Sequence, residues 1–457
     1  MPTNTSMNDA ISGIITKAQT EAATAAPKDL VYLAKTLEAV GPASELAFLT
    51  GVGEGQAADI VTKGTAATTA ITTAETQAVN SINALASSGA MPYGKITQLM
   101  NTYGNTGSGG SYRSSFSIGV DGGVYGFGCN NAFHQANGAP ELTHSPGMHP
   151  LSWESETNGN VAPANFTKIE SAAYLGAGLT ANGQVWMWGY NGHGQQGNGH
   201  TTTSGFGRKA QIPSNETIVD FCMGKSSNND NAAVMLALTA DGDVYSWGYN
   251  SHGQCGRNGT TVNAITYSPA KIPALDGVKI VRIYAVNGRD AGHCAAIDEN
   301  GILYMWGYNG YGQLGTGNTT GTSTPSQISI SGLHANEKIV HVVMTGQTYG
   351  STQLVTSEGR VFGAGYNGQG QLGNGNVSQQ TSFVLSRWWT GANDDRKVKL
   401  DTTIDANGKL VAGTGGIYGE WIAAYMWGSC DYHSSRSALS VSNKLYHWGN
   451  GDNWATI

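Results

Sequence analysis

Between residues 92 and 457, short apolar runs alternate with turn residues and each run ends at a glycine. The glycines that end these runs are Gly128, Gly189, Gly248, Gly307, Gly365 and Gly449. Successive gaps between them are 61, 59, 59, 58 and 84 residues. In the first five copies a turn pair such as Asn182-Gly183 or Asp241-Gly242 lies upstream, and its glycine precedes the glycine that ends the run by six residues. Such pairs favour tight hairpins. The intervening aromatic and β-branched residues are typical of buried strands, so the pattern predicts a repeat architecture built from hairpins.

Residues 1–91 have a different pattern, with apolar residues at a helical period. Leu30, Leu33, Leu37 and Val40 are spaced by three, four and three residues. From Ile60 to Leu85 a seven-residue repeat of mostly small residues predicts a thin coiled-coil seam, which needs partner chains for stability. The sequence therefore predicts two domains: 1–91, an α-helical stalk, coiled-coil oligomerisation or docking region, and 92–457, a mainly β domain.

The copies share the pattern hydrophobic-aromatic-x-Trp-Gly-x-Asn-x-x-Gly-Gln-Leu-Gly, and its Gln-Leu-Gly core is matched unchanged by Gln313-Leu314-Gly315 and Gln371-Leu372-Gly373. This pattern resembles the regulator of chromosome condensation-type repeat, which implies a seven-bladed β-propeller. The stretch 405–413 looks like a worn copy that brings the number of units to seven, and six blades with an insertion is the alternative. Guanine-nucleotide exchange, known in that family, is not carried over because its acidic and polar residues cannot be matched here.

The chain stops eight residues after Gly449. We therefore expect the last blade to borrow or share strands with the first blade, which starts near Lys95.

Composition limits the classes of protein and of partner that fit this chain. The 65 glycines and a charged fraction of only 12% suit tight-turned β structure. A net charge of −7 without a basic run predicts no nucleic-acid partner. The start of the chain has no signal-peptide pattern, and no apolar run approaches the ~18 residues of a membrane span, which predicts no membrane insertion. Five cysteines without CxxC spacing favour small buried side chains over a disulfide framework.

Several apparent active-site motifs fit structural roles better. The GxGxxG pattern at 192–197 recurs at the repeat period and precedes no helix that could receive a pyrophosphate. His193 and His252 occupy equivalent positions, but Tyr311 takes that position in the next copy, so no three-histidine metal set forms. We predict no catalytic, cofactor-binding or metal-ligating residue, and no enzyme activity.

The candidate contact residues for a receptor or partner are Arg387, Trp388, Trp389 and Trp153. Successive strand residues face opposite ways, so one of the adjacent tryptophans 388 and 389 is expected to be exposed beside Arg387. Exposed aromatic rings next to hydrogen-bonding groups form binding hot spots. Trp153 lies in a long insertion of the first repeat. The alternative is that each tryptophan packs beneath its own loop.

The segment 28–41 resembles N-terminal segments of bacteriophage tail-fibre and tail-associated proteins. A helical stalk followed by a β head then predicts a structural virion protein, a tail fibre or receptor-binding protein for host attachment. Its expected partners are copies of itself, as a trimer, with virion tail or baseplate proteins, and a host surface glycan or protein at the propeller loops. One alternative is a cellular propeller scaffold that binds a protein partner. Another is a polysaccharide-modifying enzyme, which would need two carboxylates held across a sugar.

Overall fold

The computed structural model describes residues 98–106, 110–119, 121–129, 136, 144–153, 163–172, 174–224, 233–257, 265–286, 292–346, 349–386, 409–410, 424–426, 434–439, 445–449 and 452–456. The chain divides into two units, 1–95 and 96–457. The predicted helical region 1–91 lies outside the described residues and stays a prediction.

The second unit is built from four-stranded antiparallel sheets, each formed by four strands that are consecutive in the chain. Six such sheets fall within the described residues. They are β1 (Gln98–Thr106), β2 (Gly110–Ile118), β3 (Val124–Cys129) and β4 (His144–Pro150); β5 (Phe166–Ala172), β6 (Leu175–Thr180), β7 (Val185–Gly189) and β8 (Ser204–Lys209); β9 (Ile218–Met223), β10 (Val234–Thr239), β11 (Val244–Gly248) and β12 (Thr266–Lys271); β13 (Ile280–Val286), β14 (His293–Asp298), β15 (Leu303–Gly307) and β16 (Thr322–Gln327); β17 (Ile339–Thr345), β18 (Ser351–Thr356), β19 (Val361–Gly365) and β20 (Gln380–Leu385); and β21 (Ala424–Met426), β22 (Ser434–Leu439), β23 (Leu445–Gly449) and β24 (Asp452–Thr456).

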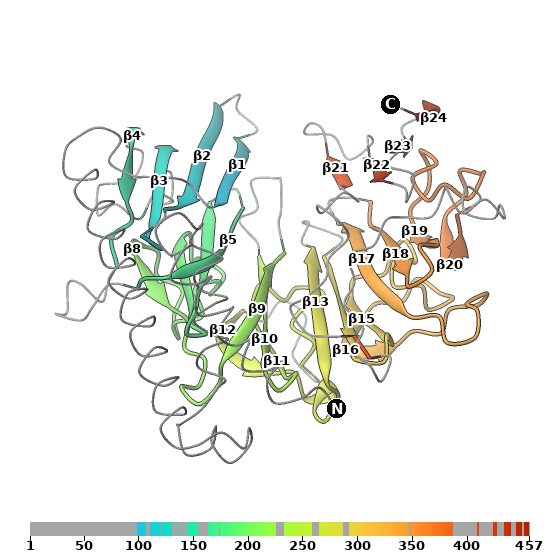
Figure 1. The fold of residues 1–457 in the computed structure, drawn as a ribbon, viewed down its shortest axis with the longest axis horizontal. Helices are drawn as coiled ribbons and strands as arrows, with labels where there is room; N and C mark the ends of the chain where they lie inside the picture. Colours follow the sequence, from blue (N-terminus) through green and yellow to red (C-terminus); the bar gives the residue numbers. More distant parts are fainter. Residues whose placement is uncertain are drawn as a thin grey trace, which may run out of the picture. The chain divides into compact units, whose positions relative to one another are not determined.

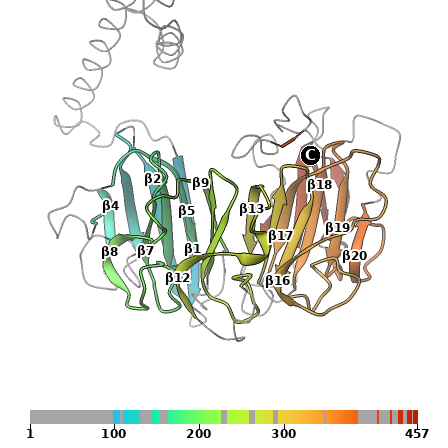
Figure 2. The same ribbon diagram turned by 90° about the horizontal axis from the view of Figure 1, so that it is seen from below.

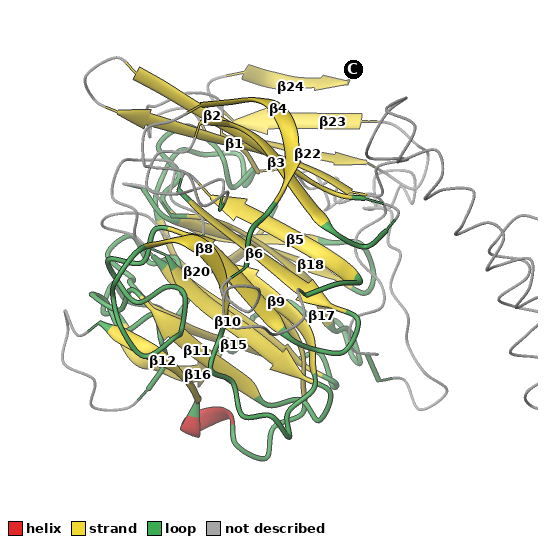
Figure 3. Cartoon of the chain, turned by 90° about the vertical axis from the view of Figure 1, so that its left-hand side faces the viewer, coloured by secondary structure: helices red, strands yellow, loops and turns green. Residues whose placement is uncertain are grey.

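This arrangement confirms a mainly β, propeller-like fold. Figure 1 shows the first strands β5, β9, β13 and β17 following one another from sheet to sheet, and Figure 2 shows the four strands β17, β18, β19 and β20 of one sheet side by side. Loops join the strands, and one short 3-10 turn, η2 (Pro273–Leu275), is the helical element coloured in Figure 3. The choice between seven and six blades stays open, because the predicted worn copy falls almost wholly outside the described residues. Of that copy, Leu410 donates its backbone N–H to the carbonyl of Glu299 at 2.8 Å.

The hydrophobic core lies between consecutive sheets. One cluster joins Met187 of β7 to Phe221 of β9, and the next joins Leu236 of β10 to Ile283 of β13. The second and third strands from β6 to β19 are almost entirely buried, whereas the fourth strands β8, β12, β16 and β20 are partly exposed. The near-continuous apolar runs of the sequence therefore became inner strands that are covered on both faces.

The repeated glycines have steric causes. The predicted turns are confirmed, because Gly183, Gly242 and Gly301 have φ values of 76°, 96° and 80° between the second and third strands of their sheets. At the end of the third strand, Gly189 has a φ of 93°, and a Cβ there would lie 2.3 Å from the carbonyl oxygen of Tyr174. A larger residue at this position would collide with backbone, so the strand can end this way only at glycine.

A tryptophan near the end of the third strand links its sheet to the preceding one. Trp247 is fully buried and donates its indole Nε1–H to the carbonyl of Gln195 at 2.6 Å. Trp306 repeats the contact one sheet later, with the carbonyl of Gln254 at 2.7 Å. In the next sheet Ala364 replaces the tryptophan, and the ring of Phe383 from β20 packs against Gly315 instead. The glycine of the preceding Gln-x-Gly motif thus packs against a large ring in each of three sheet contacts.

The expected sharing of strands between the first and last sheets is wrong for the described strands. β24 is the fourth strand of its own sheet and pairs with β23 through Gly449 and Asp452. β24 begins at Asp452, soon after Gly449, whereas β8 begins at Ser204, well after Gly189. The last described sheet therefore takes its fourth strand from the residues that follow Gly449.

We expect Trp247→Ala to destabilise the fold by about 3–5 kcal/mol, because it removes a buried ring and leaves the carbonyl of Gln195 without its indole donor. Tyr267→Ala is the matched control, since Tyr267 is 49% exposed. Chemical denaturation of both variants and the parent measures the effect. A Trp247→Ala protein as stable as the Tyr267→Ala control would show that the indole does not hold the sheets together.

Candidate functional site

The loops after β7, β11, β15 and β19 have a shape fixed by two buried amide side chains. Asn309 donates through Nδ2 to Thr316 Oγ1 and to the carbonyls of Asn318 and Thr320 at 3.0–3.1 Å. Its Oδ1 accepts the N–H of Leu314 at 2.9 Å. Asn191 and Asn367 make the same set of contacts in their own loops. The recurring spacing of the motif within this chain is thus explained by hydrogen bonds that satisfy buried loop backbone.

The second amide closes the tip of the loop. Gln313 accepts the N–H of Tyr311 through Oε1 at 3.0 Å. Gln195, Gln254 and Gln371 accept the equivalent N–H groups at 2.8–2.9 Å. The asparagine and glutamine are therefore occupied with shaping the loop, which leaves other positions of the motif to face outward.

The tyrosine that follows the motif glycine folds back across its own loop. A Cβ at Gly310 would lie 2.1 Å from the hydroxyl oxygen of Tyr308, and Gly192 and Gly368 have the same relation to Tyr190 and Tyr366. The small residue two positions later therefore leaves room for the phenol. Each of these rings is half-buried, so part of it reaches solvent.

These rings form a row that crosses consecutive sheets, which we call the aromatic band. His193 lies 5.2 Å from Tyr249 of the next sheet, and His252 lies 5.0 Å from Tyr308, measured between ring centroids. Tyr311 contacts Tyr366 at 5.8 Å, and Tyr349 stacks on Tyr366 at 4.4 Å. The band consists of Tyr190, His193, Tyr249, His252, Tyr308, Tyr311, Tyr349 and Tyr366.

The sequence identified His193, His252 and Tyr311 as equivalent positions but missed the tyrosines that connect them. The available signal was the tyrosine directly after Gly189, Gly248, Gly307 and Gly365. The structure brings the two histidines into a row of rings that also contains the intervening tyrosines. The band is therefore an aromatic surface that follows the repeat from sheet to sheet.

Of the four contact residues predicted from the sequence, the structure describes only Trp153, and it places this residue in the core. Trp153 is only 4% exposed and packs against Phe166, Trp186 and Trp188 with ring centroids 5.4–6.0 Å apart. This placement agrees with the alternative that a tryptophan packs beneath its own loop. Arg387, Trp388 and Trp389 lie outside the described residues, so their role stays a prediction.

A second group of polar side chains lies on the first strands of four consecutive sheets. Two residues after the first residue of β5, β9, β13 and β17 stand Lys168, Asp220, Arg282 and His341. Glu170, Cys222 and Tyr284 lie two residues further along β5, β9 and β13. We call these seven residues the first-strand cluster. The sequence signal for it was an ionisable residue at one register position of four repeats, which the search for conventional motifs passed over.

Ion pairs join the first two strands of this cluster. Lys168 Nζ lies 2.8 Å from Asp220 Oδ1 and 3.0 Å from Glu170 Oε1, and it donates to the carbonyl of Phe221 at 2.6 Å. Burial alone would lower the pKa of Lys168, but the two carboxylates raise it above its ordinary value. The lysine therefore stays charged and acts as an electrostatic contact between sheets.

Three other members of the cluster, Cys222, Tyr284 and His341, are uncharged at neutral pH. Tyr284 Oη lies 3.2 Å from His341 Nδ1. Burial and the neighbouring Arg282 lower the pKa of His341 to about 4, and burial raises the pKa values of Tyr284 and Cys222. These shifts keep the imidazole, phenol and thiol uncharged at neutral pH, which does not suit proton transfer or thiolate attack.

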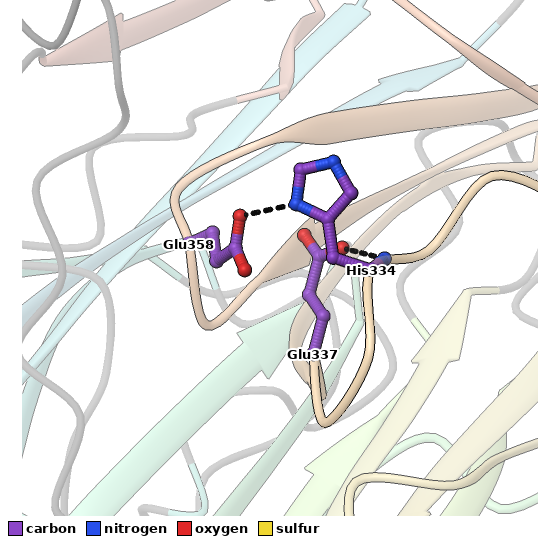
Figure 4. A group of neighbouring side chains, drawn as sticks. All are labelled: His334, Glu337 and Glu358. Atoms are coloured by element: carbon purple, nitrogen blue, oxygen red, sulfur yellow. Dashed lines mark hydrogen bonds and ion pairs between the residues drawn. The ribbon is translucent and has the colours of Figure 1, made fainter.

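One group of possible metal-binding side chains occurs among the described residues, as Figure 4 shows. Ligand atoms of His334, Glu337 and Glu358 lie within 4.8 Å of one another. Glu337 is nevertheless paired with the guanidinium of Arg360, and His334 Nδ1 lies 2.7 Å from Glu358. Burial alone would raise the pKa of Glu337, but hydrogen bonds from Arg360, Thr356 and the His334 backbone lower it. The three side chains therefore fit an ion-pair network that holds the loop of His334 and Glu337 against the turn at Glu358.

Acidification tests the state of His341. Its pKa of about 4 in the folded protein is below the ordinary value of 6.5, so the unfolded chain binds more protons between these two pH values. Stability should therefore fall as pH drops from about 6.5 to about 4, by on the order of 2 kcal/mol. Thermal melting of the parent and of His341→Gln across this window measures the difference. An equal pH dependence in both proteins would show that His341 is not responsible.

Repeated hairpins, sheets of four consecutive strands and cores between successive sheets define a repeat protein of the β-propeller type. Residues 241–287 and 300–348 match the family model described as Regulator of chromosome condensation (RCC1) repeat. These two segments therefore resemble the RCC1 repeat, which agrees with the propeller-like fold of the described sheets.

Comparison with individual proteins gives the following relatives. The chain is 30% identical to the Ultraviolet-B receptor UVR8 of Arabidopsis thaliana over 207 residues, which are 45% of this chain and 42% of UVR8. It is 28% identical to the probable E3 ubiquitin-protein ligase HERC4 of Rattus norvegicus over 237 residues, 51% of this chain and 20% of HERC4. The crystal structure of Kap60 bound to yeast RCC1 (Prp20) matches with a TM-score of 0.46 and 17% identity, covering 78% of this chain and 70% of that chain. The chain spans less than half the length of the two sequence relatives.

These relatives contradict the prediction of a bacteriophage virion protein. UVR8 and HERC4 are cellular proteins of a plant and an animal. The predicted tail-fibre role, host attachment, self-trimer, virion and host-glycan partners, and location in a virion are corrected accordingly. The physical reason for the error is that an alanine- and threonine-rich helical period fits any helical extension, and the segment 28–41 is too short to specify one.

Within the described residues, we find no helix whose length and hydropathy would let it span a membrane.

Proposed function

We propose that this chain is a cellular propeller scaffold that binds a protein partner through the aromatic band. The observation that carries the proposal is that half-buried rings in the loops of one sheet contact rings in the loops of the next, as His193 does with Tyr249, His252 with Tyr308 and Tyr311 with Tyr366. The proteins that the chain resembles in sequence include a receptor and a probable ubiquitin-protein ligase, which supports a cellular role. Their own activities are not transferred, because most of their length lies outside the match.

The chemistry of the band suits a protein interface. Tyrosine combines a large apolar ring with a polar hydroxyl, and it is enriched in the energetically important parts of interfaces. Loops placed by a rigid scaffold commonly carry binding residues. Here Asn309 and Gln313 fix the loop that presents Tyr308 and Tyr311, so the rings are held in place before a partner arrives. Binding then costs little ordering of the loop.

Catalysis is supported less well by the described residues. The first-strand cluster combines the neutral groups of Cys222, Tyr284 and His341 with a lysine that is held in ion pairs with two carboxylates. The absence of enzyme activity nonetheless stays a prediction. The segment Arg387-Trp388-Trp389 is a further proposed contact that would extend the same binding role.

Partner capture from a eukaryotic cell extract tests the proposal. Immobilised full-length chain should retain a specific protein, and the double variant Tyr308→Ala/Tyr311→Ala should retain at least about tenfold less of it. Tyr267→Ala removes an exposed tyrosine outside the band and should leave capture unchanged. Melting curves of all three proteins verify that the fold is intact.

Equal capture by the parent and the double variant would show that the partner binds elsewhere. Capture of no protein by the parent would argue against a scaffold role.

A further inference from the structure

We propose that the contact between the first sheet, β1–β4, and the second sheet, β5–β8, is a strained joint that opens reversibly, and that Trp153 holds it closed. We call this contact the first seam, and the contact between the second and third sheets the second seam. The joint is built from residues other than those of the aromatic band, so it would operate whether or not the band binds a partner.

In the first sheet an alanine stands where the later sheets have the glycine of the Gln-x-Gly motif. The carbonyl of Ala136 accepts the N–H of Ser152 at 2.6 Å, as the carbonyl of Gly197 accepts that of Gln211 at 2.8 Å one sheet later. Ala136 is fully buried and has a φ of 43°, and Gly197 has a φ of 62°. Glycine adopts this left-handed backbone freely, but alanine is strained there. The first seam therefore holds a backbone strain that the second seam avoids.

The Cβ of Ala136 also occupies the place into which the next indole would pack. In the second seam, a Cβ at Gly197 would lie 2.8 Å from Nε1 of Trp247. Trp188 is the corresponding tryptophan of the second sheet, because it directly precedes the glycine that ends the third strand. The extra methyl group at position 136 therefore prevents Trp188 from taking the position that Trp247 takes one sheet later.

The indole of Trp188 is fully buried without a hydrogen bond. Its ring lies over Gly176, its cross-strand partner, where any side chain would collide with it. Its Nε1 finds no acceptor in the part of the chain that the structure describes, whereas Trp247 donates to the carbonyl of Gln195. A buried donor that has lost its bond to water and gained no other destabilises the closed state. The first seam thus contains a second unfavourable feature.

Trp153 ties the two sheets together from the outside. Directly after β4, the carbonyl of Ser152 accepts the N–H of Gly207 in β8 at 2.9 Å, and Trp153 pairs with Gly207 in a parallel bridge. The Trp153 ring covers Gly207 so closely that a Cβ there would collide with it. The ring stacks on Phe166 at 5.4 Å and meets Trp186 edge-on at 5.5 Å, measured between ring centroids. Residues 152–153 therefore act as a strap from the first sheet to the outermost strand of the second.

Opening the first seam returns free energy that opening the second seam does not. When the strap lifts, water can accept the N–H of Trp188 and Ala136 can leave its left-handed backbone. At the second seam, opening breaks an indole–carbonyl bond and relieves no strained alanine. Strain of this kind persists only where surrounding packing enforces it, and it is concentrated at switch regions. The burial of Trp153 therefore keeps the joint closed, and its release uncovers the rings of Phe166 and Trp186.

Native-state hydrogen–deuterium exchange of the full-length protein, read at single amides, tests the joint. The amide of Gly207 reports on the strap, because it donates to the carbonyl of Ser152. The amide of Gly317 is the reference, because it donates to the carbonyl of Thr381 between the fourth and fifth sheets at 2.8 Å. We expect the protection factor of Gly207 to be at least about tenfold lower than that of Gly317.

Ala136→Gly separates strain from ordinary packing. Glycine accepts the left-handed backbone and removes the Cβ, so the variant should raise the protection factor of Gly207 by about tenfold and raise the stability measured by chemical denaturation. Ala237→Gly is the matched control, because Ala237 is a fully buried alanine within β10. This control should lower the stability, as glycine does within a strand.

Two further variants move the defect or remove the strap. Gly197→Ala places a Cβ against the indole of Trp247, so it should lower the protection of Gly199, whose N–H donates to a carbonyl of β12 across the second seam. Trp153→Ala should lower the protection of Gly207 and leave that of Gly317 unchanged.

Three outcomes would overturn the proposal. Equal protection of Gly207 and Gly317 in the parent would show that the first seam opens no more readily than a later one. A loss of stability in Ala136→Gly like that in Ala237→Gly would show that position 136 carries no strain. Equal loss of protection at Gly207 and Gly317 in Trp153→Ala would mean that the whole domain unfolds. If Trp153→Ala does not fold, the parent and Ala136→Gly decide the matter on their own.

Discussion

The packing of a large buried ring against the glycine of the preceding sheet's Gln-x-Gly motif is the constraint on which the other repeated features depend. Trp247 and Trp306 are fully buried at such contacts, and each ring also donates its N–H to an acceptor in the preceding loop. The acceptor belongs to the Gln-x-Gly motif, so the loop that follows one third strand has to reach the next sheet. Glycine is required where the ring packs, since a Cβ at Gly197 would lie 2.8 Å from the indole nitrogen of Trp247. One contact thus couples strand, loop and neighbouring sheet.

The same loop has a second consequence. Once Asn309 and Gln313 have fixed its backbone, Tyr308 folds over Gly310 and Tyr311 reaches Tyr366 of the following sheet. Residues that hold the sheets together and residues that form the aromatic band therefore alternate within one short motif. A repeat under this constraint produces a row of rings without any separate binding element. Substitutions at the outward-facing positions can therefore alter recognition while the buried ring contact between sheets is kept.

The sequence was sufficient for the propeller-like fold because its signals are local. Asn182-Gly183 and Gly189 each set a backbone conformation that few other residues accept, so the hairpins follow from the residues themselves. The candidate site depended on contacts between sheets, such as Lys168 with Asp220 and His252 with Tyr308, which join residues more than 50 positions apart. Trp153 illustrates the same limit, because only the packing of an insertion against β7 and β8 decides that its ring is buried.

Binding through the motif loops makes one end of the sheets the partner-binding face. Hydrogen–deuterium exchange of the full chain with and without its captured partner tests this placement. We predict slower exchange for backbone amides in 308–312 and 366–370 when the partner is bound. Amides at the opposite strand ends, around the Asn300-Gly301 and Glu358-Gly359 turns, should exchange at an unchanged rate. Protection confined to those turns, with no change in the motif loops, would contradict it.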